Sequence, residues 1–129
     1  TQLANDRIIV STASENDWHQ NIQELNWKLY LCSSPPFLLQ TKNDKRMKKY
    51  TDLALRKDFE NSKPISDSLD TVRKAFHHSK PLGKPHAHQK YWQELLGQVG
   101  GRTRFPNREL TNDEKKKINK AFEASGLIK

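Results

Sequence analysis

The chain has 129 residues, a single cysteine, and 23 Lys and Arg residues against 15 Asp and Glu residues, which gives a formal charge of +8. One thiol cannot form a disulfide within the chain, so a small secreted module held together by disulfides is excluded. No apolar run approaches the roughly 18 residues of a membrane span, and the first residues do not resemble a signal peptide. These features predict a soluble, cytoplasmic protein without a membrane partner.

The chain is also unusually polar for its length. Its mean hydropathy of −0.97 leaves little apolar material for a self-contained core. We therefore expect either an unusually charged surface or a core that another part of a protein completes.

The first third of the chain has the pattern of a β-α-β unit. Ile8–Val10 and Leu29–Cys32 are short apolar runs, and neither alternates with polar residues, which is typical of strands buried on both faces of a parallel sheet. Between them, Ser14 is a candidate helix N-cap, and Ile22 and Leu25 lie three residues apart, so the segment has room for one crossover helix. We expect two adjacent parallel strands with a right-handed connection.

Helical patterns follow the break at residues 34–36. Met47, Tyr50 and Ala54 form one apolar stripe, which predicts a helix over about residues 44–57. A second helix is predicted from a stripe made of Ile65, Leu69, Val72 and Phe76. Pro64 should lie in its first turn or just before it, because proline costs roughly 3 kcal/mol inside a helix.

Two more helices are predicted towards the C-terminus. One runs from about His86 to Gly97. The other begins at Thr111–Glu114, which has the sequence of a capping box, and Gly126 fits the C′ position after its end. The predicted order is β-α-β followed by about four helices. Because two parallel strands leave both faces and both edges open, the sequence looks like the end of something larger.

The order of several segments along the chain is characteristic: Trp27–Ser33, Leu53–Glu60, Gly83–Gly97, and Gly100–Pro106 leading into Leu110–Glu114. This order resembles the C-terminal part of the dihydrodipicolinate synthase / N-acetylneuraminate lyase family, the Schiff-base lyases built on a (β/α)8 barrel. The resemblance implies an α/β fold class, in which this chain is the C-terminal part of a TIM barrel. Residues 1–58 would form the last two βα units, and residues 59–129 the C-terminal helical extension.

The resemblance also implies an activity. Family members act as lyases on a 2-oxo acid such as pyruvate through an imine, and they need no cofactor because the protonated imine is the electron sink. Their catalytic lysine and tyrosine belong to the sixth and fifth strands, which would precede Thr1. Lys28 cannot substitute, because it lies at the N-terminal end of its strand and barrel active sites form at the opposite face. We therefore expect no catalytic residue here, a missing N-terminal barrel half on the same or a separate chain, and a homo-oligomer.

Four hydroxyl residues are candidates for lining the substrate site. Ser11 and Thr12 follow the first strand, and Ser33 and Ser34 follow the second, so in a barrel they would lie at its mouth and could hydrogen-bond a carboxylate or hydroxyl. The alternative is that Ser11, Thr12 and Ser14 are turn and capping residues, and that Ser34 simply precedes a proline.

Other chemistry is not favoured. Cys32 has no neighbouring base or positive charge, so we expect it in the core rather than as a nucleophile. Adjacent histidines on a helix point about 100° apart, and no suitable Cys or carboxylate set joins them, so no metal site is predicted. Four histidines are expected at the surface or at helix ends: His77, His78, His86 and His88. Three aromatic residues are expected in the core or at subunit contacts: Trp27, Tyr91 and Trp92.

The basic stretches at residues 42–49 and 115–117, with Arg102, Arg104 and Arg108, could contact phosphates. No motif of a nucleic-acid-binding fold accompanies them, so we expect solvated surfaces without specific nucleic-acid binding. Two alternatives remain open. One is a small basic helical module that binds nucleic acid or an acidic partner, and the other is a noncatalytic remnant that binds a family barrel.

Overall fold

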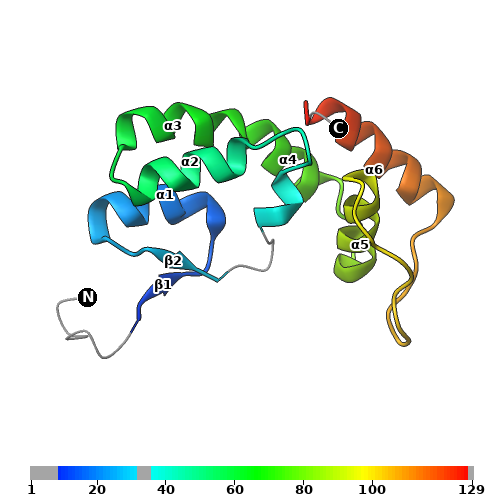
Figure 1. The fold of residues 1–129 in the computed structure, drawn as a ribbon. Helices are drawn as coiled ribbons and strands as arrows, with labels where there is room; N and C mark the ends of the chain where they lie inside the picture. Colours follow the sequence, from blue (N-terminus) through cyan, green and yellow to red (C-terminus); the bar gives the residue numbers. More distant parts are fainter. Residues whose placement is uncertain (1–8, 32–35, 128–129) are drawn as a thin grey trace. The chain divides into compact units, whose positions relative to one another are not determined.

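A computed structural model describes residues 9–31 and 36–127 of the chain (Figure 1). The described part is mostly helical and contains a small parallel sheet, which is loosely compatible with the expected α/β class. It divides into two compact units whose segments interleave in the sequence. The first unit comprises the described residues up to Pro36 together with Arg46–Ser68, and the second comprises Phe37–Lys45 and the residues from Leu69 onwards. The sequence predicts a boundary after residue 58, between the barrel units and the helical extension. This boundary does not coincide with the division into two compact units, and it stays a prediction.

The first unit begins with the β-α-β arrangement. Strands β1 (Ser11–Thr12) and β2 (Leu29–Tyr30) flank helix α1 (Glu15–Leu25) in the sequence. The strands pair in parallel, with Ser11 opposite Leu29 and Thr12 opposite Tyr30. Helix α1 begins directly after Ser14, the predicted N-cap position, although the Ser14 side chain makes no capping hydrogen bond. The parallel pairing and the crossover helix confirm the predicted unit.

Two details of that prediction are wrong. Strand β1 lies directly after the apolar run rather than on it, so Ile9 precedes the strand. The strands are also not buried on both faces, because the exposed fractions are 77% for Ile9, 52% for Leu29 and 78% for Leu31. The described sheet has only two strands and one crossover helix, and much of its apolar surface therefore has nothing to pack against.

Helices α2 (Arg46–Leu55) and α3 (Phe59–Ser68) complete the first unit and pack against each other. The α2 stripe predicted from the sequence is buried, as expected. Pro64, however, lies inside α3, so the prediction that it occupies the first turn is wrong. The helix begins earlier because the Asp58 carboxylate accepts the Asn61 N–H at 3.3 Å, which is the contact of an N-cap.

The second unit contains a 3-10 turn, η1 (Pro36–Leu39), apart from its first residue, and the helices α4 (Asp70–His78), α5 (Pro85–Leu95) and α6 (Asn112–Ala124). Helices α4 and α5 both pack on α6. The stripe predicted as one helix is divided between α3 and α4, with Leu69 at the break. Trp92 lies at the centre of the core, where its ring centroid is 5.2 Å from that of Phe76 and 5.1 Å from that of Phe122.

The ends of α6 follow the predicted signals. The Thr111 hydroxyl accepts the Glu114 N–H at 3.3 Å, and the Glu114 carboxylate accepts the Thr111 N–H at 2.7 Å, which is a complete capping box. Gly126 adopts a φ of 73° just after the helix, as a C′ glycine does. Among the residues that the structure describes, no helix is both long and apolar enough to cross a membrane.

Candidate functional site

The structure places two of the four predicted substrate-lining residues. Ser11 and Thr12 form β1, whereas Ser33 and Ser34 lie outside the described residues, as does Cys32. Thr12 is buried, and its hydroxyl donates to the Ser14 carbonyl at 3.4 Å and accepts the Ser14 N–H at 3.3 Å. This is the local bonding of a turn residue, which is the alternative interpretation of Thr12. Contact with a substrate stays a prediction for all four residues.

A buried cluster lies next to the C-terminal ends of the two strands. Glu15, the first residue of α1, accepts a hydrogen bond from the Tyr50 hydroxyl, and both side chains are buried. The Trp18 ring packs between Tyr30 and Tyr50, with centroid distances of 5.3 and 5.9 Å. Tyr50 lies 35 residues beyond Glu15 in the chain, and no sequence pattern pairs the two, so this contact could not be predicted from the sequence.

His19 and Ser62 form a second buried polar contact in the first unit. His19 Nε2 lies 2.6 Å from the Ser62 hydroxyl, and Ser62 is fully buried. Burial lowers the pKa of His19, and the nearby charge of Lys63 lowers it further. A Ser–His pair has the composition of a nucleophile and its base. A fully buried hydroxyl cannot reach a substrate, however, so this geometry serves packing between α1 and α3.

His88 is also buried, so its predicted surface position is wrong. It precedes Trp92 by one helical turn and therefore faces the core, where its ring lies 4.7 Å from that of Phe76. His88 Nε2 is 3.0 Å from the Ser79 hydroxyl, whereas Nδ1 has no hydrogen-bond partner among the described residues. Burial is the main cause that lowers the pKa of His88 to about 4, and the charge of Lys80 adds to it. The other three histidines of the predicted surface set are exposed.

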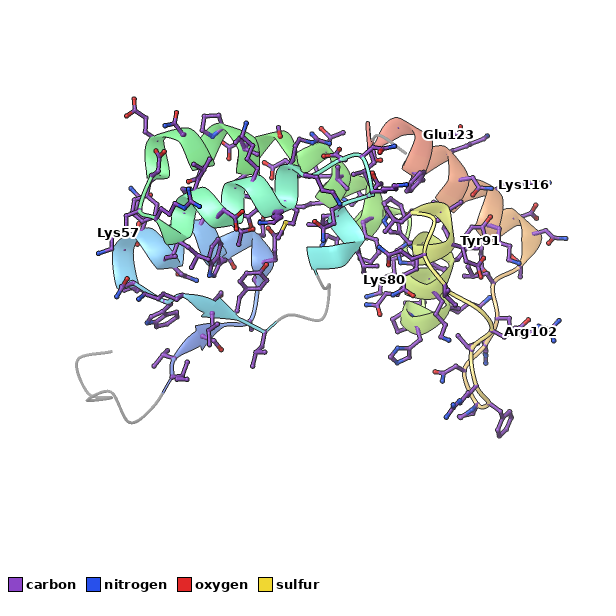
Figure 2. All side chains as sticks on the ribbon, in the orientation of Figure 1. Lys57, Lys80, Tyr91, Arg102, Lys116 and Glu123 are labelled. Atoms are coloured by element: carbon purple, nitrogen blue, oxygen red, sulfur yellow. The ribbon has the colours of Figure 1, made fainter. Side chains whose placement is uncertain are left out.

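A pocket of about 220 Å³ lies in the second unit, beside α5, the segment 101–110 and the start of α6. Its lining combines two cations, two carboxylates and apolar surface: Ala87, Tyr91, Glu94, Gly101, Arg102, Thr103, Glu109, Leu110 and Lys115. Figure 2 shows Tyr91 on α5 facing α6, with Arg102 on the following segment. The sequence predicts Tyr91 in the core or at a subunit contact, and Arg102 and Lys115 on solvated surfaces. The structure brings these three side chains to one site.

Specific contacts hold the walls of this pocket. Lys115 Nζ lies 5.5 Å from the centroid of the Tyr91 ring, and the Tyr91 hydroxyl donates to Asn119 at 3.0 Å. The Glu94 carboxylate accepts the Gly101 N–H at 2.9 Å. A Cβ atom at Gly100 would lie 2.1 Å from the Lys90 carbonyl oxygen, so only glycine lets the segment lie this close to α5. The Gly100-Gly101 pair is the sequence signal that could have indicated the pocket.

No family model, curated protein or solved structure matches the chain.

Proposed function

We propose that this chain supplies the last two strands and the C-terminal helical extension of a (β/α)8 barrel, and that the assembled protein is a Schiff-base lyase acting on a 2-oxo acid such as pyruvate. The observation that carries the proposal is the incomplete parallel sheet. Strands β1 and β2 are parallel and are connected through a helix, which is the repeating unit of such a barrel.

The sheet is unfinished in a way that calls for further strands. Ile9, Leu29 and Leu31 are more than half exposed although they are apolar and lie in or beside the two strands. Parallel sheets are ordinarily covered on both faces, and a pair of strands is not stable in isolation. Neighbouring strands and their helices would bury these side chains and satisfy the open edges.

The expected chemistry divides the roles between this chain and the rest of the barrel. In barrels the active site forms at the C-terminal ends of the strands, which here are Thr12 and Tyr30. The resemblance assigns the imine-forming lysine and the catalytic tyrosine to strands that precede this sequence. This chain would therefore shape the mouth of the site without taking part in imine formation. The missing barrel half, homo-oligomeric assembly and a cytoplasmic location belong to the same proposal.

Trapping the imine tests the proposal. The protein is captured from its natural source with an antibody against this sequence, incubated with pyruvate and sodium cyanoborohydride, and mapped by peptide mass spectrometry. We expect a pyruvyl adduct on one lysine outside these 129 residues, on the same or a co-purifying chain. The recombinant 129-residue chain is the control and should show no specific adduct. A specific adduct on a lysine of this sequence, or none in the captured protein, would contradict the proposal.

A further inference from the structure

We infer that the pocket of the second unit binds a nucleotide, with the base inside the pocket and the phosphate at Arg102 and Lys115. This inference does not depend on the proposed lyase activity, because none of the pocket residues belongs to the β-α-β unit. It rests on four properties of the pocket, namely its cations, its carboxylates, its apolar wall and its size.

The cations are available for a phosphate. Lys115 rests over the Tyr91 ring and has no carboxylate within ion-pair distance in the part of the chain that the structure describes. Arg102 lies 3.9 Å from Glu109 in a solvent-exposed pair, and such pairs are weak. Lys90 does not line the pocket, but its ammonium group donates to the Arg102 backbone carbonyl at 3.0 Å and so helps to hold the segment that carries Arg102. Charge-assisted hydrogen bonds from Lys and Arg are the usual contacts of a bound phosphate.

The carboxylates disfavour a simple anion as the ligand. Glu94 and Glu109 line the same pocket as the two cations, so a bare phosphate or carboxylate would be repelled as well as attracted. The exocyclic amino groups of cytosine, adenine and guanine are hydrogen-bond donors that a carboxylate accepts. Glu94 is held by the Gly101 N–H through one oxygen, which orients the carboxylate and leaves its second oxygen for such a donor.

The wall and the size suit one base. Tyr91, Leu110 and Ala87 supply apolar surface against which the faces of a base can pack. The volume of about 220 Å³ is below the roughly 300–1,000 Å³ of sites for drug-sized ligands. The pocket therefore fits a single nucleobase, with the sugar and phosphate towards the exposed cations.

The nucleotide can be free or part of a single strand. Phe105 is 96% exposed and is flanked in the sequence by Arg104 and, further on, Arg108. An exposed aromatic ring among arginines is the surface on which neighbouring bases of a strand stack. The shared chemistry is a base joined to a phosphate, and the experiment separates the two sources.

The first experiment titrates the full chain with CMP, UMP, cytidine and inorganic phosphate, and follows binding by calorimetry and by amide NMR shifts. CMP should shift Tyr91, Glu94 and Leu110. UMP should bind about fivefold more weakly or worse, because it presents a carbonyl where cytosine has an amino group. Cytidine and phosphate should each bind more weakly than CMP. Equal affinity for CMP and UMP, or for CMP and phosphate, would overturn the inference, as would no binding at millimolar concentration.

Matched variants on one helix test the role of the charge. Lys115→Gln should weaken CMP binding about tenfold. Lys117 is exposed on the same helix but does not line the pocket, so Lys117→Gln should change CMP binding less than about twofold. Glu94→Gln should narrow the difference between CMP and UMP, since the amide can also donate to a carbonyl. Equal losses in Lys115→Gln and Lys117→Gln would mean that the basic surface as a whole binds, which contradicts a defined site.

Comparison of CMP with a hexacytidylate strand identifies the source. Binding of the strand more than about tenfold tighter than CMP, reduced by Phe105→Ala, would assign the pocket to a single strand. Leu82→Ala is the control, because Leu82 is fully exposed but does not line the pocket. Equal affinities would assign the pocket to a free nucleotide.

Discussion

Two histidines, His19 and His88, are buried in the interior of this protein. His19 contacts Ser62 in the first unit, and His88 contacts Ser79 in the second. Each histidine therefore has one hydrogen-bonding serine on another part of its unit, and burial lowers the pKa of both rings. Neutral rings of this kind are compatible with a core, whereas protonated rings would carry a buried charge.

Removing the partner of His19 should destabilise the protein. Ser62→Ala leaves His19 Nε2 buried without a hydrogen bond, and the expected cost is about 1–3 kcal/mol in the free energy of unfolding. Urea denaturation measures this change. The control is Thr71→Val, which removes an exposed hydroxyl at nearly constant shape and should cost less than about 0.5 kcal/mol. Equal stabilities of the two variants would contradict the proposed role of the contact.

Acidification should destabilise the second unit through His88. The pKa of His88 is about 4 in the folded protein, against about 6.5 for an unperturbed histidine. At pH values between these two, the imidazole of the unfolded chain binds a proton that the folded chain does not bind. The contribution of His88 to the free energy of unfolding is therefore complete above about pH 6.5 and decreases as the pH falls. Between pH 7 and pH 5 the expected loss from His88 is about 1–2 kcal/mol.

Urea denaturation at several pH values between about 5 and 7 tests this expectation. His88→Gln should show a flatter pH dependence than the wild type, although His19 still contributes in the same direction. His78→Gln is the control, because it removes an exposed imidazole in place of a buried one. The pKa of Glu114 lies below its ordinary value of 4.5 because Lys84 hydrogen-bonds its carboxylate, so its contribution is lost only below this pH range. The same slope in wild type and His88→Gln would refute the assignment.

At the scale of single elements, α6 has the best-defined ends. Its first turn is closed by the capping box, and Lys84 Nζ donates to both oxygens of Glu114 at 2.9 and 2.7 Å. The same glutamate thus caps the helix and links it to the segment before α5. Helix α3 shows the opposite case, since it contains a proline and is retained by packing against α2.

The N-cap of α6 should contribute measurably to stability. Thr111→Ala removes the hydroxyl that accepts the Glu114 N–H, and the expected loss is about 1 kcal/mol. Thermal unfolding followed by circular dichroism measures it. Asn112→Ala changes the neighbouring exposed residue, which has no capping role, and should have a smaller effect. A Thr111→Ala variant as stable as Asn112→Ala would show that the cap is dispensable.

At the scale of the whole molecule, the main feature is apolar sheet surface that the described residues leave uncovered. Leu31→Asp should change the stability of the isolated chain by less than about 0.5 kcal/mol, because the side chain is already 78% exposed. The same substitution should abolish association with the remainder of the proposed barrel, since it would bury an unpaired charge there. Co-purification measures this association, and Leu82→Asp is a control in the other unit. Retained association in Leu31→Asp would argue against barrel completion at this sheet.

Much of the local structure could be predicted because its signals are local. The capping box at Thr111–Glu114 and the glycine at residue 126 mark the ends of α6 through contacts between residues a few positions apart. The buried stripe Met47, Tyr50 and Ala54 follows from the helical period alone. Two apolar runs separated by a helix-length segment were enough to indicate parallel strands.

The tertiary structure alone decided which of these elements find partners. A continuous stripe does not reveal that the chain turns at Leu69, because the break depends on which helices α3 and α4 pack against. An apolar run predicts a strand but cannot show whether other residues cover it. Likewise, the sequence cannot show whether a polar residue such as His88 is exposed or, as the structure has it, buried. The pocket around Tyr91 joins residues from two helices and the segment between them. Periodicity and capping act over one or two turns of chain, whereas burial and sites arise between segments far apart in the sequence, and only folding brings these together.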